Sequence, residues 1–404
     1  MPEAVIVSVA RSPIGRAHKG SLKDMRPDDL AVQMVRAALE KVPALDPVHI
    51  EDLILGCGQP AGEQGHNLGR AVAVLSGLDQ VPGTTVNRYC SSSLQTTRMA
   101  LHAIKAGEGD VFVSAGVETV SRYTQGVADV PGTENPLFAD AQSRTEKFAA
   151  GGERWADPRE HGQLPDLYIA MGQTAENVAQ YKGVTRAEQD EFGVRSQNLG
   201  ENAITNGFWE RDITPITLPD GTVISTDDGP RAGVTLEKVS ELKPVFRPDG
   251  TVTAANCCPL NDGAAAVVIM SGTKAEELGI APLARVVATG VSGLSSEIMG
   301  LGPVEASRQA LRRAGMTIGD IDLAEINEAF AAQVIPSYRD LGLDIDKLNV
   351  NGGAIAVGHP FGMTGARITS TLINSLQFHD KQFGLETMCV GGGQGMAMIL
   401  ERMS

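Results

Sequence analysis

The chain has 404 residues, of which 42% are hydrophobic and 21% are charged, and its formal net charge is −15. This composition is typical of a globular protein with about two to three domains and a large core. The acidic balance argues against broad binding to nucleic acids or to anionic membranes, because both need a basic surface. An anionic ligand would therefore have to meet a local basic patch.

Nothing in the sequence indicates export, membrane insertion or a metal site. The start, MPEAVIVSVARSPIG, carries Glu3 and only a short apolar run, unlike a secretory signal. No segment approaches the roughly 20 apolar residues of a membrane span. An odd number of cysteines without CxxC spacing favours free thiols in a reducing cytoplasm. The five are Cys57, Cys90, Cys257, Cys258 and Cys389.

The first part of the chain alternates strands with helices. The β-branched run AVIVSVA at 4–10 predicts a strand buried on both faces, and 52–56 and 110–116 predict two more. A helical pattern follows Pro27. Another follows the segment NRYCSSSLQ and ends at Gly107, a residue typical of a C-cap. This alternation predicts parallel sheets covered by helices.

The region from about 121 to 243 has a different character. It is richer in Pro, Gly and charge, and it contains both tryptophans, Trp155 and Trp209. Helical patterns occur at 174–181 and 186–206. We interpret the region as a large insertion on an α/β scaffold, the kind of segment that often carries function.

The α/β pattern resumes at 264–270, and from Leu283 the chain repeats its own beginning. ARVVATGVSG corresponds to AVIVSVARSP, DIDLAEI to IEDLILG, and ETMCVGGG to DVFVSAG. LNVNGGAIAVGH corresponds to TTVNRYCSSS, and we interpret each as a short strand ending in Val-Asn before a loop and a helix. The shared order of these segments predicts a duplicated α/β unit.

Three loops of the second half contain residues suited to catalysis. They are EINEAFA, NGGAIAVGHPFGMTGAR and CVGGGQG, which hold Asn327, His359 and Cys389. Ligands of parallel sheets bind beyond the carboxyl ends of the strands, where these loops could meet Cys90. Together they supply a nucleophile, an imidazole to take its proton, a second thiol and an amide donor for an oxyanion.

Each of these residues also has an ordinary structural interpretation. Cys90 and Cys389 could be small buried residues, and Asn327 could cap the following helix. His359 is the one histidine flanked by Gly and Pro, in a loop that permits close approach of a ligand. A cysteine at a helix start meets backbone N–H groups and the positive end of the dipole, which predicts a lowered pKa for Cys90.

Nucleotide and metalloenzyme motifs are missing from the sequence. It contains neither a GxxxxGK[ST] phosphate loop nor an HExxH motif. The glycine-rich GVSGLSSEIMGLG segment does not make a dinucleotide fingerprint, and GGGQG lies too close to the C-terminus for a βαβ unit to follow.

Seven segments between 87 and 395 resemble the thiolase family, which comprises acetyl-CoA acetyltransferases and 3-ketoacyl-CoA thiolases. They are NRYCSSSLQ, GVETVS, MGQTAENVA, LNDGAAAV, INEAFA, GGAIAVGHPFGMTGAR and CVGGGQG. The resemblance implies an α/β thiolase fold, with duplicated βαβαβαββ halves in five αβαβα layers. The N-terminal half would be 1–120, completed by 261–282, and the C-terminal half 283–404. A CoA-binding loop domain would be inserted at 121–260.

The resemblance also implies CoA-dependent acyl transfer by a ping-pong route. The reaction would be thiolysis of 3-ketoacyl-CoA, condensation of two acetyl-CoA molecules, or both. Cys90 would carry the acyl group as a thioester, His359 would take its proton, and Cys389 would act as general acid/base. Asn327 would hold a water that completes one oxyanion site, and the N–H groups of Cys90 and Gly391 would form the other.

CoA would be a substrate and product of this reaction, with no tightly bound cofactor and no metal. By the resemblance, Arg231 would lie near the adenosine phosphates, Met171 and Cys258 would lie along the pantetheine arm, and Phe330 would be a further CoA contact. Weaker candidates for basic contacts are Arg195, Lys182 and Lys238. The resemblance implies a homodimer or homotetramer that acts on acyl-CoA in fatty acid and lipid metabolism.

Three positions depart from the family pattern. Ser93 stands where the family usually has Gly, which could restrict the helix start. Cys258 stands where many members have Ser, and Ala170 where short-chain biosynthetic members often have His. Loss of the histidine ring could open acyl space, so the sequence leaves the chain length open, together with the preferred direction.

Two other functions share this fold. One is a ketoacyl or hydroxymethylglutaryl-type synthase, and the other is a non-catalytic protein that binds acyl-CoA or lipid. The synthases generally lack a cysteine in the CVGGGQG position. Binding alone does not need Cys90, His359 and Cys389 together, so these residues favour a thiolase.

Overall fold

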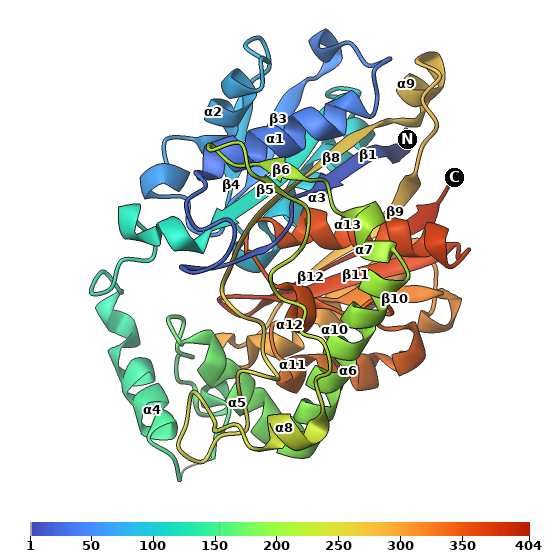
Figure 1. Cartoon of the computed structure of the whole chain (residues 1–404). Helices are drawn as coiled ribbons and strands as arrows, with labels where there is room; N and C mark the ends of the chain where they lie inside the picture. The colour runs from blue at the N-terminus through green and yellow to red at the C-terminus, as the bar shows by residue number, and fades with distance from the viewer. Residues whose placement is uncertain (1, 153) are drawn as a thin grey trace.

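The computed structural model describes residues 2–152 and 154–404, and a ten-stranded sheet runs through both halves of the molecule (Figure 1). The strand order is β10-β11-β12-β9-β1-β8-β5-β3-β4, with β2 paired to β8. The strands are β1 (Ala4–Arg11), β2 (Gly15–Arg16), β3 (Asp52–Gly56), β4 (Gly83–Val86), β5 (Val111–Thr119), β8 (Asn261–Ser271), β9 (Ala284–Gly293), β10 (Leu323–Ile326), β11 (Phe383–Val390) and β12 (Gln394–Arg402).

Two sets of helices accompany this sheet. Those that follow or precede its strands are α1 (Pro27–Glu40), α2 (Leu68–Leu75), α3 (Ser92–Ala106), α9 (Gly272–Glu277), α10 (Gly302–Ala314), α11 (Ala331–Leu341), α12 (Ala354–Val357) and α13 (Thr364–Phe378). Between β5 and β8 the chain forms α4 (Ala139–Ala149), α5 (Met171–Lys182), α6 (Arg186–Thr205), α7 (Phe208–Asp212), α8 (Leu236–Ser240) and the small two-stranded sheet of β6 (Ile216–Thr217) and β7 (Val223–Ile224).

The duplication inferred from the sequence is visible in the strand order. β4-β3-β5-β8-β1 form one half of the sheet and β10-β11-β12-β9 form the other, so β1, β3, β5 and β8 correspond to β9, β10, β11 and β12. The two halves join where Val5 pairs with Arg285 and Ile6 with Ala284. In Figure 1 the first half is blue to cyan except for the gold strand β8, and the second half is orange to red.

The buried side chains form three large hydrophobic clusters, and these explain the layers. Along β1, Ala4 and Ile6 face a central cluster, whereas Val5 and Val7 face an outer one. The central cluster includes side chains of α3 and α13, the outer cluster of the first half includes α1 and α2, and that of the second half includes α10 and α11. Because successive strand residues point to opposite faces, a continuous apolar strand fills two cores at once. The result is the five-layered αβαβα arrangement that the resemblance implied.

The expectation of parallel sheets is confirmed for only some of the strand pairs. β3 runs parallel to β4 and β5, and β10 runs parallel to β11, but β8, β1, β9 and β12 pair antiparallel with their neighbours. β11 and β12 are joined by a turn at Gly391–Gly393, too short for the crossover that parallel strands need. The sheet is therefore mixed.

The regular elements agree well with their sequence patterns. The strands at 4–10, 52–56 and 110–116 are β1, β3 and β5, and the stretch at 264–270 lies within β8. The helices after Pro27 and after NRYCSSSLQ are α1 and α3. Gly107 ends α3 with φ 77°, a left-handed conformation that glycine adopts without steric cost. The two helices expected in the insertion are α5 and α6.

The short strand expected at LNV does not form. Only an isolated bridge joins Leu348 to Ala324, and Asn349 follows with φ 45°. The Asn349 side chain instead takes the place of a strand, because Ile326 N–H donates to its Oδ1 at 2.9 Å and its Nδ2 donates to Ile326 O at 2.9 Å. Asparagine tolerates the left-handed region and offers both a donor and an acceptor, so one side chain imitates a pair of ladder hydrogen bonds.

The described residues between β5 and β8 add no strand to the main sheet. Its helices α5 and α6 pack on α11, and in the view of Figure 1 α5 lies below the strands of the second half. This agrees with an insertion, while the exact boundaries at 120, 260 and 282 stay predictions. Among the described residues, no helix combines the length and the hydropathy that a bilayer crossing requires.

Two central helices, α3 and α13, contact each other in the layer between the two halves of the main sheet. Their contact is very close at Gly365, where a Cβ atom would lie 2.1 Å from the backbone nitrogen of Leu94. Cys90 lies just before α3 and His359 just before α13. The glycine therefore fixes how near the two loops that precede these helices can come.

Replacing Gly365 with alanine should destabilise the protein strongly. The methyl group meets backbone rather than a movable side chain, so we expect a loss of about 3 kcal/mol or more in the free energy of unfolding, measured by chemical denaturation. Gly272→Ala is the matched control, since its Cβ would have no atom nearer than 4.0 Å and φ is not positive. We expect that control to be neutral or to stabilise by about 0.5–1 kcal/mol. Equal effects of the two substitutions would contradict the close approach of α3 and α13.

Candidate active site

Cys90 lies in a single turn of 3-10 helix, Tyr89–Ser91, immediately before α3. Tyr89 has φ 43°, a left-handed conformation that is unfavourable for a bulky residue. The Asn87 side chain compensates in part, because its Oδ1 accepts the Tyr89 N–H at 2.7 Å. The turn changes the chain direction sharply between β4 and α3 and so places Cys90 at the wall of a cavity.

The environment of the Cys90 thiol is neutral and desolvated. Burial raises its pKa to about 12, although the backbone N–H groups of Gly391 and of Cys90 itself act in the opposite direction. The expected lowering at a helix start was wrong. Desolvation outweighs the N–H groups, and no cation among the described residues contributes. The resting group is therefore a thiol.

His359 is held in one tautomer by its neighbours. Thr364 Oγ1 uses its only hydrogen to donate to Pro360 O at 2.7 Å, so it must accept from His359 Nδ1, which lies 2.6 Å away. The proton is thereby assigned to Nδ1, and Nε2 carries a lone pair. Nε2 is buried without a protein partner. Burial, with a smaller effect of Arg367, lowers the His359 pKa to about 3.

The backbone near His359 is anchored from the first half of the chain. The His359 N–H donates to Asn261 Oδ1 at 2.9 Å, and Asn261 Nδ2 donates to Gly15 O at 3.0 Å. The His359 ring stands edge to face with Phe361, at a centroid distance of 5.2 Å, and Phe361 lines the same cavity as Cys90. The structure thus brings the histidine loop to the cysteine cavity.

Cys389 and Gly391 come from the end of β11 and the glycine turn after it. Burial raises the Cys389 pKa well above its usual range, and the nearby Cys90 raises it further. Gly391 lies over Tyr89, whose ring carbon Cδ2 would be 3.3 Å from a Cβ at that position. The structure therefore places both residues beside Cys90.

Asn327 follows β10, and its side-chain amide could bind a polar ligand. Its backbone is fixed, because its N–H donates to Thr387 O at 3.0 Å and its carbonyl accepts from Gln333 Nε2 at 2.7 Å. Both atoms of its side-chain amide are buried without a protein partner. The alternative that Asn327 caps a helix was wrong, since α11 starts later with Phe330 at its N-cap. Buried polar groups need partners, so the site is suited to a water or a substrate oxygen.

Glu118 is an important site residue that the sequence interpretation did not single out. Its buried carboxylate accepts N–H bonds from Gly58 at 2.7 Å, Gln59 at 3.2 Å and Gly362 at 2.8 Å. It thus joins the loop after β3 to the histidine loop. The sequence feature that could have identified Glu118 is a single carboxylate at the end of a buried strand, in the segment GVETVS.

Ser93 has a defined partner. Its hydroxyl is fully buried and accepts the backbone N–H of Ala366, in the first turn of α13, at 2.9 Å. Thr364 in that same turn orients His359. A hydrogen bond therefore links the helix that follows Cys90 with the helix that follows His359, and Ser93 does not interrupt the start of α3.

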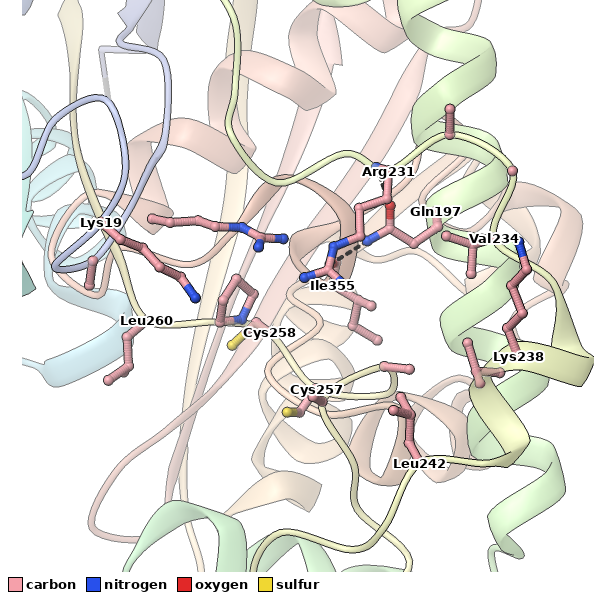
Figure 2. Close-up of a pocket in the computed structure, with 18 of the residues that line it drawn as sticks. Lys19, Gln197, Arg231, Val234, Lys238, Leu242, Cys257, Cys258, Leu260 and Ile355 are labelled. Atoms are coloured by element: carbon pink, nitrogen blue, oxygen red, sulfur yellow. Dashed lines mark hydrogen bonds between the residues drawn. The ribbon is translucent and has the colours of Figure 1, made fainter.

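A basic cavity of about 660 Å³ contains two of the expected CoA contacts, Arg231 and Cys258 (Figure 2). The basic residues that line it are Arg16, His18, Lys19, Arg231 and Lys238. Burial and the facing Arg231 guanidinium lower the pKa of Arg16, whose Nε is buried without a protein partner. Two guanidinium groups facing each other are suited to an anion between them.

The other expected CoA residues lie in different surroundings. Met171 lines the cavity of Cys90, and Phe330 packs edge to face on Phe246 with centroids 6.2 Å apart. Of the weaker candidates, Lys182 pairs with Asp340 and Arg195 donates to the carbonyls of Ile345 and Leu348. These contacts place Lys182 and Arg195 outside the basic cavity.

Cys258 lines the basic cavity and lies near the thiols of Cys90 and Cys389. Burial raises its pKa well above the usual value, and the neighbouring Cys257, Cys90 and Cys389 raise it further. Its N–H donates to Ala329 O at 3.1 Å, next to Phe330. Cys258 therefore stands between the basic cavity and the cavity that contains Cys90.

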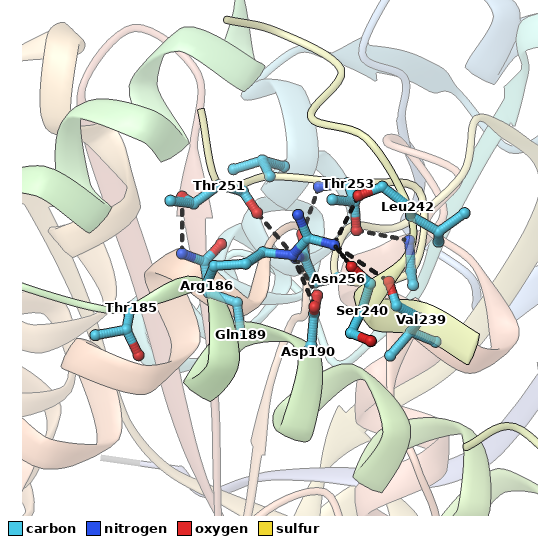
Figure 3. Close-up of polar contacts among 12 residues, drawn as sticks. Thr185, Arg186, Gln189, Asp190, Val239, Ser240, Leu242, Thr251, Thr253 and Asn256 are labelled. Carbon is cyan, nitrogen blue, oxygen red and sulfur yellow. Dashed lines mark hydrogen bonds and ion pairs between the residues drawn. The ribbon is translucent and has the colours of Figure 1, made fainter. Parts of the chain in front are cut away.

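The segment that carries Cys258 is fixed by a polar network (Figure 3). Arg186 Nε donates to Asp190 Oδ2 at 2.7 Å, and Asn256 Nδ2 donates to Asp190 Oδ1 at 2.9 Å. The Asn256 carbonyl in turn accepts the N–H of Ala331 at 2.8 Å. This network secures the loop before Cys258 to the start of α11, close to Phe330.

A metal centre has no support in the described part of the chain, which brings together no group of three or more His, Cys, Asp or Glu side chains able to hold an ion. All five cysteines are free thiols. What the structure assembles is two buried thiols, a neutral imidazole and backbone N–H donors.

A duplicated α/β fold that brings two buried thiols and an imidazole together is suited to an acyl-transfer enzyme, and comparison with known proteins agrees with that class. Residues 4–273 match the thiolase N-terminal domain and residues 280–402 match the thiolase C-terminal domain. The chain belongs to the thiolase family. It is thus a CoA-dependent C-acyltransferase that cleaves 3-ketoacyl-CoA by thiolysis or condenses acetyl-CoA.

Individual relatives match over the whole chain. A 3-ketoacyl-CoA thiolase of Bacillus subtilis is 42% identical over 414 residues, covering 99% of this chain and 100% of the relative. A β-ketoadipyl-CoA thiolase of Acinetobacter baylyi is 41% identical over 416 residues, covering 100% of both. The crystal structure of the Bacillus anthracis acetyl-CoA acetyltransferase has a TM-score of 0.86 and 38% identity, covering 100% of this chain and 99% of that one.

The pH dependence of Cys90 alkylation tests the neutral state of the site. With Cys90 protonated up to a pKa of about 12 and His359 neutral above a pKa of about 3, the thiolate fraction grows with pH throughout the working range. The rate of modification by iodoacetamide, followed by peptide mass spectrometry between pH 5 and 9, should rise about tenfold per pH unit. A rate independent of pH from about 5 to 8 would instead indicate a thiolate–imidazolium pair.

Ser93→Ala should destabilise the protein by about 1–2 kcal/mol, because the buried N–H of Ala366 loses its partner. Chemical denaturation measures the change. Ser143→Ala, on an exposed position of α4, is the control and should shift the free energy of unfolding by less than about 0.5 kcal/mol. A neutral Ser93→Ala would show that the link between α3 and α13 contributes nothing.

Proposed function

We propose that Cys90 carries the acyl group during thiolysis and condensation. The observation that carries this proposal is the position of its sulfur against the N–H groups of Cys90 and Gly391, beside the second thiol of Cys389. In thiolysis the Cys90 sulfur attacks the 3-keto carbon of the substrate and its proton passes to Nε2 of His359. A neutral imidazole with a free lone pair and a thiol are the starting states that this transfer needs.

Cys389 acts as the general acid and base in this mechanism. When the bond between C2 and C3 breaks, the electron pair remains on C2, and Cys389 gives that carbon a proton to release acetyl-CoA. The Cys389 thiolate then takes the proton of an incoming CoA thiol, which attacks the Cys90 thioester. The new acyl-CoA leaves, and Cys90 recovers its proton from His359. Condensation is the reverse sequence.

Two oxyanion sites stabilise the charges that develop. The N–H groups of Cys90 and Gly391 face the oxygen of the Cys90 thioester. The enolate oxygen of acetyl-CoA is met by protonated Nε2 of His359 and by a water on the Asn327 amide. Nε2 of His359 and both amide atoms of Asn327 are buried and lack a protein partner, so they are available for this role.

CoA binds in the basic cavity as substrate and product, and the enzyme needs no resident cofactor. Arg231 and the facing Arg16 hold phosphate groups, and Lys19 and Lys238 add charge at the same cavity. In an acidic chain this local patch meets the anionic ligand. The pantetheine arm passes Cys258 on its way to Cys90, and Met171 and Phe330 flank the passage.

We further propose the division of the chain into halves at 1–120 with 261–282 and at 283–404, and a CoA-binding domain at 121–260. Arg231 and Lys238 belong to that inserted segment, which supports the division. A homodimer or homotetramer is supported by β4, which ends the strand order and leaves an edge for pairing with a second copy. The five free thiols support a cytoplasmic location.

A synthase or a non-catalytic binding protein gains no support from the site. The discriminating residue is Cys389, and it lies near enough to Cys90 for the two thiols to influence each other. A binding protein would not need a second buried thiol at that position.

Cys90→Ala and Cys389→Ser form a matched pair that tests the two roles. After incubation with acetyl-CoA, intact mass spectrometry should show an acetyl adduct on the wild type and on Cys389→Ser, but none on Cys90→Ala. Condensation by Cys389→Ser should be at least about 10²-fold slower, since a hydroxyl is a much weaker acid/base. An acetylated, active Cys90→Ala would contradict the nucleophile, and normal condensation by Cys389→Ser would contradict the acid/base role.

A further inference from the structure

Two cavities adjoin the catalytic thiols, and their charges are opposite. The cavity with Arg231 and Cys258 is lined by five basic residues and by no carboxylate among the described residues. The cavity with Cys90, of about 540 Å³, is lined by Asp129 and Glu134, and none of its described lining residues is Lys, Arg or His. The first suits the phosphates of CoA, so the second is left for the part of the substrate beyond the reacting carbonyl.

The Cys90 cavity is larger than an acetoacetyl group requires. Volumes of about 300–1,000 Å³ are typical of sites for drug-sized ligands. Apolar side chains form much of its wall, and they include Leu167, Ile169, Met171 and Phe361. Such a wall gains free energy by covering methylene groups of a longer chain.

The acidic side of this cavity has no internal counter-charge. Asp129 accepts from Gln59 Nε2 and from the Tyr89 hydroxyl at 3.5 Å, both neutral donors. In the described part of the chain, neither Asp129 nor Glu134 takes part in an ion pair. Their negative charges therefore remain to act on whatever occupies the cavity.

We propose that this cavity binds the acyl chain of an uncharged 3-ketoacyl-CoA longer than acetoacetyl-CoA, and that Asp129 and Glu134 discriminate against chains ending in a carboxylate. The inference rests on the proposed role of Cys90. A terminal carboxylate brought beside the two side chains meets like charges and no cation, which opposes its binding. Asp129 is exposed and Glu134 is half-buried, so the repulsion is moderated by solvent and decreases with salt.

Overall sequence similarity does not tell whether this chain prefers uncharged acyl chains or chains that end in a carboxylate. Relatives whose names specify a plain 3-ketoacyl-CoA and a β-ketoadipyl-CoA are 42% and 41% identical to this chain. The preference between the two substrate classes therefore depends on the few residues around the distal end of the acyl chain.

Two substrates of equal length test the proposal. 3-Oxohexanoyl-CoA and 3-oxoadipyl-CoA have the same six-carbon chain and differ in the terminal carboxylate. For the full-length protein at low ionic strength, kcat/KM for thiolysis should favour 3-oxohexanoyl-CoA by at least about tenfold. The ratio should fall as salt is added, because exposed carboxylates are screened. Equal or faster cleavage of 3-oxoadipyl-CoA would overturn the proposal.

Asp129→Asn should reduce this ratio by about threefold, mainly through a lower KM for 3-oxoadipyl-CoA, and Glu134→Gln should act in the same direction. Asp140→Asn is the matched control, because Asp140 is exposed on α4, outside the cavity, and its replacement changes the net charge equally. A ratio that shifts as much in Asp140→Asn as in Asp129→Asn would assign the effect to overall charge and overturn the role of Asp129.

Acetoacetyl-CoA separates this inference from the proposed function. Thiolysis of acetoacetyl-CoA with an acyl group on Cys90 supports the catalytic assignment whatever the preference between longer chains. If acetoacetyl-CoA is cleaved but 3-oxohexanoyl-CoA is not, the inference about chain length fails alone. If none of the three is cleaved and Cys90 is never acylated, the proposed function fails.

Discussion

The buried carboxylate of Glu118 is the interaction on which the active site depends. Desolvation raises its pKa, so it is stabilised only by the donors around it, which come from the loop after β3, from Gln64, from Tyr123 and from the histidine loop at Gly362. Those loops belong to different halves of the duplicated fold. One residue therefore couples the wall of the Cys90 cavity to the position of His359, and the Ser93–Ala366 bond adds a second link between the two halves.

Burial sets the chemical character of the site. The thiols of Cys90 and Cys389 have raised pKa values and the imidazole of His359 has a lowered one, all mainly through desolvation. In the mechanism we propose, charge develops only when substrate arrives, against N–H donors that are already in place. In this strongly acidic chain, basic residues gather around the cavity of Arg231, while Asp129 and Glu134 line the cavity of Cys90.

Much of this could be predicted from the sequence, and the exceptions have physical causes. Continuous apolar strands and capped helices are local properties, and so are the glycine turn at Gly391–Gly393 and the order of the repeated segments. The pKa of Cys90 could not be read locally, because the helix start lowers it while burial by distant residues raises it more. The missing strand near Asn349 and the partner of Ser93 likewise depend on elements far away in the chain.

The sequence by itself determined which residues can do the chemistry and that two similar halves carry them. Residue type and loop position are local properties; they made Cys90, His359 and Cys389 candidates, and the resemblance to the thiolase family joined them as a predicted set. Only the tertiary structure decided which of the polar atoms are left without partners, how the charges differ between the two cavities, and that burial raises the pKa of both thiols. These properties follow from desolvation and electrostatics, which sum over all neighbours in space and hence over residues hundreds of positions apart.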